Sequence, residues 1–373
     1  MASAFALYRL PHAERYVKVQ GSTQEFTSCA LLNGRSGFVM APFQVKQEQP
    51  IVLIAPEQVT EVPLPPSPIT QPPSPNPQHP SPNTQHPSPF YHIDFSSFHA
   101  QLQQGIFRKI VLSRCADEPA GQPVDPEELF LRACQLYPRM FIALVYTPQS
   151  GLWLTATPEI LLDGDGASWR TIALAGTMAL EGDQLLGEGE TARWSTKNIE
   201  EQRVVATYIA ECLERFATDF QEEGPRTVRA ANLVHLRSDF TFSLPSDDCL
   251  GDLLMALHPT PAVCGLPKCE AFDFIVHNEH TPRRYYSGFM GPLRMPITPL
   301  ELRSLATNGT QEHPSPNTHL YVSLRCMNID RDVYHLYAGG GLLKDSVEEQ
   351  EWLETEAKLE TMRQVMRHSN EKT

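Results

Sequence analysis

The sequence lacks the short motifs that mark several large enzyme classes. It has no CxxC pair, no Walker phosphate loop, no GxGxxG fingerprint, no HExxH helix and no GxSxG elbow. It also lacks a long hydrophobic run, because the longest one, Met140–Tyr146, has the length of a single strand. The apolar start at Met1–Tyr8 is too short for a signal peptide. We therefore expect neither a membrane protein nor a secreted one, and neither a P-loop nor a dinucleotide-binding enzyme.

Positive charge is also scarce. The chain of 373 residues carries 30 basic and 44 acidic side chains, which leaves a formal net charge of −14. A field of that sign repels nucleic-acid phosphates and anionic lipid, so we expect no nucleic-acid or membrane partner. An anionic ligand would need a few placed cations or a metal ion. The eight scattered cysteines indicate reduced thiols in a cytoplasmic protein rather than a disulfide framework or a zinc site.

Proline, in contrast, is concentrated in one place. Twelve of the 27 residues from Pro63 to Pro89 are proline, and the others are mostly polar. Such a segment cannot form a ladder of hydrogen bonds or a core, so we expect a disordered insert at 63–89. The word HPSPNT at His79–Thr84 recurs at His313–Thr318, which indicates inserted loop material. A PxxP-type docking segment is the alternative. The expected organisation is then N-terminal strands at 1–62 and a catalytic region at 94–368, within the same domain.

The remaining chain alternates between strand-like and helix-like patterns. The patterns predict an amphipathic helix over Ser195–Phe220 and a C-terminal helix over Ser346–Arg367 that opens with a capping box, Ser346 and Glu349. Strands are predicted at Lys109–Cys115, Phe141–Thr147, Leu152–Thr157, Trp169–Ala175, Leu233–Phe242, Tyr286–Leu293, Tyr321–Asn328 and Val333–Ala338. Hairpins mixed with separate helices indicate an α+β fold.

Some polar residues stand out against this pattern. Glu201 heads the apolar stripe of the first helix, where it either reaches water at the edge or faces a partner or a metal. On the last helix, Glu351, Glu354 and Lys358 share one face, either as a surface Glu–Lys pair or as an inward cluster. Two inward carboxylates on different helices would suit Mg²⁺. The run Gly339–Gly341 is either a simple tight loop or a backbone cradle for an anion.

Considered together, these segments resemble the chorismate-utilising enzymes, the family of isochorismate, salicylate, anthranilate and aminodeoxychorismate synthases. The resemblance extends from about Phe107 to Met366. Its blocks are KIVLSR at Lys109–Arg114, ATPEILL at Ala156–Leu162, LAGT at Leu174–Thr177, STKNIEEQRVV at Ser195–Val205, VHL at Val234–Leu236, ALHPTPAV at Ala256–Val263, RRYYSG at Arg283–Gly288, SLRC at Ser323–Cys326, YAGGGLL at Tyr337–Leu343 and EWLETEAK at Glu351–Lys358.

The resemblance implies a role for each matching position. Lys109 matches the general base that activates the nucleophile, and Glu159 the general acid that protonates the departing C4 hydroxyl of chorismate. Glu201 and Glu354 match Mg²⁺ ligands, with Glu351 as a water-mediated partner. The positions that match the substrate-binding groups are Gly176, Thr177, His235, Ala262, Tyr286, Arg325, Gly340, Gly341 and Lys358. The implied fold is two antiparallel β-sheets packed as a sandwich with helices outside.

Local features indicate one branch of the family. Ala175 stands where aminodeoxychorismate synthases carry a nucleophilic lysine, and Ala262 where salicylate synthases place a threonine. The HPTPA segment resembles that of isochorismate synthases. We therefore expect an isochorismate synthase acting as a monomer, with salicylate synthase, or an amine-transferring enzyme with a separate amidotransferase subunit, as alternatives. Two departures, Asn198 and Cys264, could alter substrate positioning. The product would serve menaquinone or siderophore synthesis, with menaquinone favoured because no carrier or lyase domain is recognised.

Overall fold

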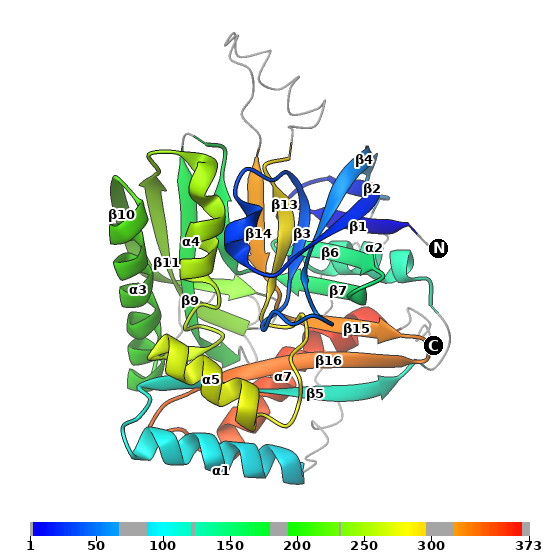
Figure 1. Ribbon diagram of the computed structural model, residues 1–373. Helices are drawn as coiled ribbons and strands as arrows, with labels where there is room; N and C mark the ends of the chain where they lie inside the picture. The colour runs from blue at the N-terminus through cyan, green and yellow to red at the C-terminus, as the bar shows by residue number, and fades with distance from the viewer. Residues whose placement is uncertain are drawn as a thin grey trace.

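Strands dominate the architecture (Figure 1). The computed structural model describes residues 3–66, 88–120, 124–166, 168–179, 193–230, 233–295 and 317–367. Most of the segment expected to be disordered at 63–89, and most of the second HPSPNT copy at 313–318, lie outside these ranges. The strands are β1 (Ala4–Arg9), β2 (Arg15–Phe26), β3 (Gly37–Ala41), β4 (Ile51–Pro63), β5 (Lys109–Pro119), β6 (Phe141–Thr147), β7 (Gly151–Thr157), β8 (Ile160–Gly164), β9 (Trp169–Ala179), β10 (Asp219–Ala230), β11 (Leu233–Ser243), β12 (Gly265–Leu266), β13 (Phe289–Leu293), β14 (Thr318–Val322), β15 (Cys326–Asp330) and β16 (Val333–Leu342).

These strands form one sheet in the order β10-β11-β9-β8-β14-β13-β3-β4-β2-β1-β6-β7-β15-β16-β5-β12. The pairings are antiparallel, and the hairpin predicted between Phe141–Thr147 and Leu152–Thr157 is the β6–β7 pair. An antiparallel α+β fold is therefore confirmed. The two separate sheets of the expected sandwich are not confirmed, because hydrogen bonds connect all sixteen strands in a single sheet.

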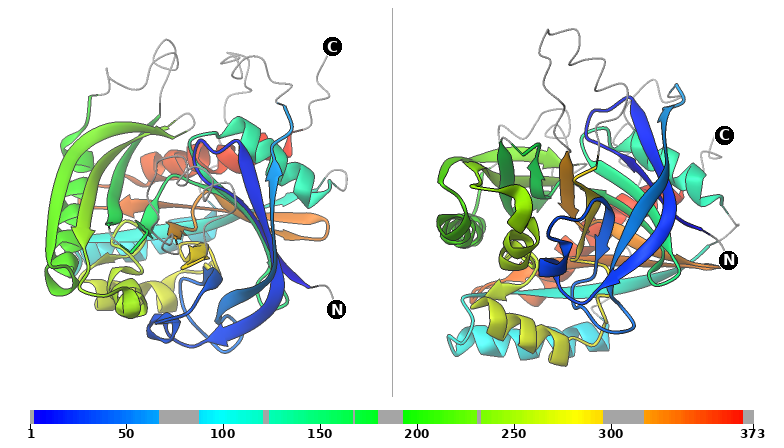
Figure 2. Two further views of the ribbon diagram at one scale, coloured as in Figure 1. Left: turned by 90° about the horizontal axis from the view of Figure 1, so that it is seen from above. Right: turned by 45° about the horizontal axis from the view of Figure 1, so that its top comes forward.

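The single sheet nevertheless encloses a core between its own parts. Strands β9 and β13 run across the direction of β5 and β16 (Figures 1 and 2). One buried cluster includes Ala6 from β1, Phe38 from β3, Trp153 from β7, Ile172 from β9 and Tyr337 from β16. Strands that are distant in the sheet order thus pack on one another. Bending gives the sheet the face-to-face packing that a sandwich obtains from two sheets.

Helices cover parts of this sheet. The C-terminal helix buries Leu359, Met362 and Val365 in a cluster with residues of β16, and the long central helix packs Val205 and Ile209 with residues of β9 and β11. No helix in the described ranges is long and apolar enough to cross a membrane. The helices are α1 (Pro89–Gln103), α2 (Pro126–Leu136), α3 (Thr196–Phe216), α4 (Leu250–Leu257), α5 (Lys268–Asn278) and α7 (Glu348–Met366).

Two local predictions were wrong, and one open alternative is excluded. The capping box is absent, because α7 begins at Glu348 after Val347, and the Ser346 hydroxyl instead accepts a hydrogen bond from the Leu343 N–H at 3.0 Å. Of the two alternatives for the glycine run, the simple tight loop is excluded, because the run continues β16 and pairs with β5.

The predicted strand Tyr321–Asn328 is also two strands, β14 and β15, with different neighbours in the sheet. The chain changes direction between them at Arg325, whose φ of 46° lies in the left-handed region that few non-glycine residues adopt. Such strained backbone is found preferentially at functional sites.

Candidate active site

A cavity of about 590 Å³, counting the space at its mouth, opens where β9, β11, β16, α3 and α7 meet. Ten of the thirteen residues predicted for the site line it. The other three adjoin lining residues, since Lys109 pairs with Glu201, Glu354 pairs with Lys358, and Gly340 lies between Gly339 and Gly341. The ten are Glu159, Gly176, Thr177, Glu201, His235, Ala262, Tyr286, Arg325, Gly341 and Lys358.

Glu159 is a buried carboxyl group in the short connection between β7 and β8. Its backbone N–H donates to the Thr157 hydroxyl at 3.2 Å, and its carbonyl accepts from the Val322 N–H at 2.9 Å, so β7 and β14 both hold it. Burial raises the pKa of Glu159 to about 8, although Lys109, Arg325, Lys358 and Thr260 favour the anion. At neutral pH this group therefore carries a proton that it can donate.

Lys109, the first residue of β5, is fully buried and forms an ion pair with Glu201 of α3 across 3.0 Å between Nζ and Oε1. Burial alone would raise the pKa of Glu201, but Lys109, Lys197 and Lys358 outweigh it, so that the pKa is lowered and the group is an anion. The alternative of a solvated helix-edge residue is wrong for Glu201, which is only 8% exposed.

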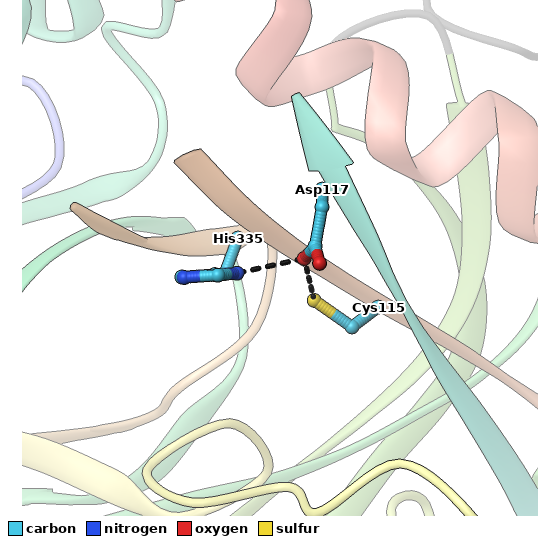
Figure 3. A group of neighbouring side chains, drawn as sticks. All are labelled: Cys115, Asp117 and His335. Atoms are coloured by element: carbon cyan, nitrogen blue, oxygen red, sulfur yellow. Dashed lines mark hydrogen bonds and ion pairs between the residues drawn. The ribbon is translucent and has the colours of Figure 1, made fainter. Parts of the chain in front are cut away.

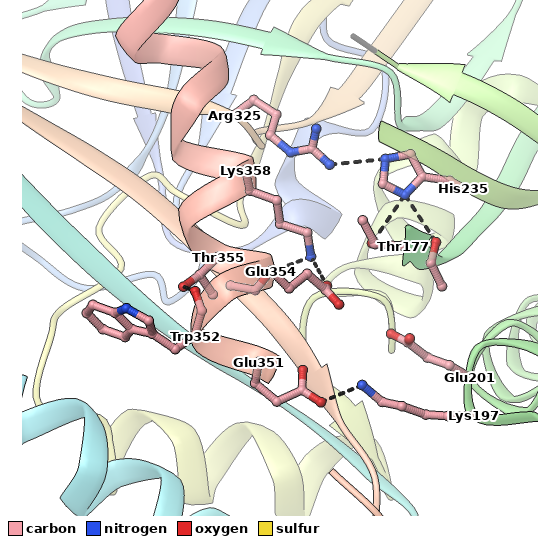
Figure 4. A network of polar contacts seen from close by, with 12 residues as sticks. Thr177, Lys197, Glu201, His235, Arg325, Glu351, Trp352, Glu354, Thr355 and Lys358 are labelled. Carbon is pink, nitrogen blue, oxygen red and sulfur yellow. Dashed lines mark hydrogen bonds and ion pairs between the residues drawn. The ribbon is translucent and has the colours of Figure 1, made fainter. Parts of the chain in front are cut away.

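Two more carboxylates, Glu351 and Glu354, lie on α7, and each forms an ion pair with a different lysine (Figure 4). Glu351 pairs with Lys197, and Glu354 pairs with Lys358 across 2.6 Å. Burial and the neighbouring Glu354 raise the pKa of Glu351, although Lys197 acts in the opposite sense. The predicted i,i+4 pair on α7 thus exists, but it faces the site rather than water.

The carboxylates have the chemistry that a hard divalent cation requires. Glu201, Glu351 and Glu354 point into one space between α3 and α7 (Figure 4). Among the described residues, Oε2 of Glu351 is buried without a hydrogen-bond partner, so one oxygen is left for another ligand. Mg²⁺ prefers one or two carboxylates together with water and an anionic substrate. The residues present therefore fit Mg²⁺.

The glycines of β16 leave room for these groups. A Cβ on Gly341 would lie 2.2 Å from Oε1 of Glu201 and 2.8 Å from Cε of Lys109, which is far inside van der Waals contact. A Cβ on Gly340 would lie 3.2 Å from Oε2 of Glu351, and one on Gly339 would lie 2.8 Å from the Tyr286 hydroxyl. The three glycines are required as a flat strand surface against which charged side chains can lie.

Cations mark the other side of the cavity. Nη1 of Arg325 is buried and has no hydrogen-bond partner among the described residues, while Nη2 donates to Nε2 of His235 at 3.1 Å. The Lys358 ammonium donates to the Gly339 carbonyl at 2.8 Å as well as to Glu354. A guanidinium with a free buried N–H beside an ammonium is suited to binding a carboxylate.

Two groups near the site were not predicted. Lys197 belongs to the STKN block and lies one helical turn before Glu201. That spacing suggests a contact within α3, whereas Lys197 in fact forms an ion pair with Glu351 of α7. Thr260 lies in the HPTPA segment, of which only Ala262 was assigned to the site, and it acts to lower the pKa of Glu159. A threonine between two prolines carries no periodic signal that would reveal this effect.

Asn198 and Cys264, the two residues that depart from the family pattern, have different surroundings. Backbone and Cβ atoms of Asn198 lie 3.1–3.2 Å from where a Cβ of Gly176 would be, so Asn198 closely supports a backbone segment that lines the cavity. Cys264 is fully buried in an apolar cluster with Phe107 and Ile110, away from the cavity wall. Ala175 and Ala262 both line the cavity with methyl groups, which offer no nucleophile.

Solved structures share this architecture. Over 98% of this chain and 89% of the other, the fold matches MenF, the menaquinone-specific isochorismate synthase of Escherichia coli, with a TM-score of 0.74 and 22% identity. It also matches anthranilate synthase component I of Streptococcus pneumoniae over 98% of this chain and 91% of the other, with a TM-score of 0.67 and 16% identity. The chain therefore shares its fold with both of these synthases.

Sequence comparison gives the family. The chain belongs to the chorismate binding enzymes, whose family pattern matches residues 40–295 and 311–367. Over 260 residues it is 28% identical to the isochorismate synthase EntC of Escherichia coli. The aligned region covers 69% of this chain and 62% of EntC. The chain thus aligns with less than two thirds of the length of that curated relative.

Proposed function

We propose that this chain is an isochorismate synthase, which converts chorismate to isochorismate by adding water at C2 and expelling the C4 hydroxyl. The observation that carries the proposal is Glu159, a buried acid whose pKa is raised to about 8 and which lines the same cavity as the carboxylate-binding groups Arg325 and Lys358. Similarity to EntC, named an isochorismate synthase, supports the same activity.

Substrate binding would use the cationic wall. Chorismate is a dianion, and Arg325, with one buried N–H free, and Lys358 would each hold a carboxylate. Backbone at Gly176, Gly340 and Gly341 would contribute to substrate binding, since these residues add no side chain of their own to the cavity. Thr177, His235, Ala262 and Tyr286 would line the ring and the enolpyruvyl group.

Proton transfers would be divided between two residues. Glu159 would give its proton to the C4 oxygen as that C–O bond breaks, which releases water rather than hydroxide. Lys109, in its neutral amine form, would take the proton of the water whose oxygen bonds to C2, while the ring double bonds shift. The two events leave the composition of the substrate unchanged, as an isomerisation requires.

Glu201 and Glu354, with Glu351 nearby, would hold Mg²⁺. When bound, Mg²⁺ would neutralise the ring carboxylate and polarise the ring toward attack at C2. The protein's own contribution is to hold three carboxylates close together, each beside a lysine.

Two alanines favour this branch over the alternatives. Ala175 cannot form the covalent bond that a nucleophilic lysine would, and Ala262 leaves a wall without a hydroxyl. Product formation without an amine and without pyruvate loss is therefore the expected outcome.

The wider assignments follow the same proposal. We propose that 1–62 and 94–368 act as one catalytic domain, since β1 pairs with β6 and β3 with β13.

We propose a cytoplasmic location, which the eight free cysteines support, and a monomeric enzyme without nucleic-acid or membrane partners. Menaquinone synthesis is the proposed destination of the product, in line with the name of the structural neighbour MenF.

Product analysis tests the proposal. Purified protein is incubated with chorismate and Mg²⁺, with and without ammonium, and products are separated by liquid chromatography with mass spectrometry. Isochorismate alone, at a ratio to chorismate that becomes constant, is the expected result. Salicylate with pyruvate, or a product that requires ammonium, would assign the chain to another branch. Glu211→Gln, an exposed change on α3, is the control that should leave the ratio and the rate unchanged.

A further inference from the structure

A second group of metal-binding side chains lies at the other ends of two active-site strands (Figure 3). Cys115 and Asp117 are two residues apart on β5 and therefore project from the same face. His335 of β16 is the register partner of Asp117, which places its imidazole on that face too. A thiol, a carboxylate and an imidazole thus meet at one point, although 218 residues separate Asp117 from His335.

The three ligand atoms are close enough to share one ion. Nδ1 of His335 lies 2.7 Å from Oδ1 of Asp117, and Sγ of Cys115 lies 3.4 Å from the same oxygen. All three atoms lie within 4.8 Å of one another. Around tetrahedral Zn²⁺, bonds of about 2.3 Å to sulfur and about 2.0–2.2 Å to nitrogen and oxygen place the ligand atoms about 3.3–3.7 Å apart. Sγ of Cys115 and Oδ1 of Asp117 already have this separation. Nδ1 of His335 and Oδ1 of Asp117 share a hydrogen bond, so a bound ion would replace that bond and move the two atoms apart by roughly 0.6 Å.

This cluster is separate from the carboxylate site. Cys115 lies six residues after Lys109 along β5, which at about 3.3 Å per residue is a distance of about 20 Å. The donor atoms differ as well, since the first site offers only oxygen whereas this one offers sulfur, nitrogen and oxygen. Hard Mg²⁺ favours the former set, and borderline ions such as Zn²⁺ favour the latter.

We propose that Cys115, Asp117 and His335 form a binding site for a transition-metal ion of the Zn²⁺ class. Three protein ligands leave a fourth position of a tetrahedron to water. The side chain of Asp117 is 68% exposed and that of His335 is 26% exposed, so an ion can enter from solvent without opening the fold.

The surroundings of the sulfur set the cost of metal binding. Burial, followed by the charge of Asp117, raises the pKa of the Cys115 thiol to about 12, although Tyr337 acts in the opposite sense. A bound ion must therefore displace a proton from the sulfur. The ring of Tyr337 stacks on Tyr286 with 5.6 Å between centroids, which connects this cluster to the cavity wall.

Cobalt provides a direct probe. The full chain is freed of metal with a chelator and titrated with Co²⁺ while its absorption spectrum is recorded. We expect a thiolate-to-cobalt charge-transfer band, with ligand-field bands typical of tetrahedral cobalt, and loss of both on addition of Zn²⁺. The measurement needs no turnover, so its result is independent of the proposed activity.

Variants identify the ligands. Cys115→Ser should abolish the charge-transfer band, and His335→Gln should weaken Zn²⁺ affinity at least tenfold. Cys269→Ser, at an exposed cysteine on α5, is the matched control and should change neither quantity. A band that persists in Cys115→Ser, an unchanged affinity in His335→Gln, or a wild-type chain that shows no charge-transfer band would overturn the site. Circular dichroism verifies that each variant is folded.

Discussion

Arg325 donates a hydrogen bond from Nη2 to Nε2 of His235 at 3.1 Å, and both side chains are buried. Nδ1 of His235 lies 3.1 Å from the Gly176 carbonyl, so this nitrogen carries the hydrogen and Nε2 is free to accept. Burial, followed by Arg325 and Lys358, lowers the pKa of His235 well below its usual value, which keeps the ring neutral. The imidazole thus orients the guanidinium while taking no part in proton transfer.

The first prediction concerns this orientation. His235→Phe removes the acceptor and leaves a buried N–H of Arg325 unpaired, which costs about 1–3 kcal/mol. We expect KM for chorismate to rise about tenfold or more, with a smaller change in kcat. Steady-state kinetics measure both constants. His277→Phe, at an exposed position on α5, should leave them unchanged, and an unaltered KM in His235→Phe would show that the bond does not position Arg325.

The second prediction separates catalysis from stability at Glu159. Glu159→Gln keeps the shape of the side chain but removes its proton donor, so turnover should fall by roughly 10²–10⁴-fold. The same change removes a carboxyl whose ionisation the fold resists, so Tm at pH 8.5 should rise. Thermal unfolding and product assays measure the two effects. Full activity in Glu159→Gln would exclude it as the acid.

The third prediction concerns pH. The folded pKa of Glu159, about 8, lies above its value in the unfolded chain. Its contribution to stability is therefore complete below the unfolded pKa and is lost as pH rises through about 8. Catalysis needs the protonated form, so kcat/KM should fall on the alkaline side of about pH 8. A pH–rate profile checks this, and a flat profile between pH 7 and 9.5 would contradict the assignment.

The fourth prediction concerns the flat surface of β16. Gly341→Ala would drive a methyl group against Glu201 and Lys109, and displacements of about 1 Å in a catalytic site can reduce rates about 100-fold. We expect a loss of that order in turnover with the fold retained. Gly105→Ala is the control, because a Cβ there meets no atom of the described residues within 4 Å, although its φ of 74° strains the backbone. Its activity should be normal and its Tm slightly reduced.

The fifth prediction uses the balance of three carboxylates and three lysines. Lys197→Met removes the partner of Glu351 and leaves one negative charge uncompensated. The half-saturating Mg²⁺ concentration should therefore decrease, while Tm in the absence of Mg²⁺ should also decrease. Calorimetric titration and thermal unfolding test both, with the exposed Lys344→Met as control. Weaker Mg²⁺ binding in Lys197→Met would count against a metal site at these carboxylates.

Periodicity in the sequence predicted most elements but not their ends. The apolar stripe of α3 was predicted within a few residues, because Val205 and Ile209 repeat at helical spacing. The break at Arg325 was missed because its left-handed φ results from contacts with remote strands, which no local pattern encodes. The alternatives for Gly339–Gly341 stayed open for a related reason, since the need for glycine comes from Glu201 and Tyr286 across the cleft.

The sequence motifs indicated which residues belong to the site, but not which residues they would pair with. Glu201 was a candidate because it headed a buried stripe, whereas its pairing with Lys109 joins residues 92 positions apart. Likewise, the spacing of Cys115 and Asp117 is unremarkable until β16 brings His335 alongside.

The order of strands in the sheet has a consequence for how the chain folds. The cavity draws its walls from β5, β9, β11, β16, α3 and α7, so its components are spread over some 250 residues of sequence. Pairings of this range are slow to form because long loops must close first. The cavity then exists only once nearly the whole sheet is assembled, and a ligand bound there stabilises the entire molecule rather than one part of it. Substrate should therefore protect even distant strands from proteolysis and hydrogen exchange.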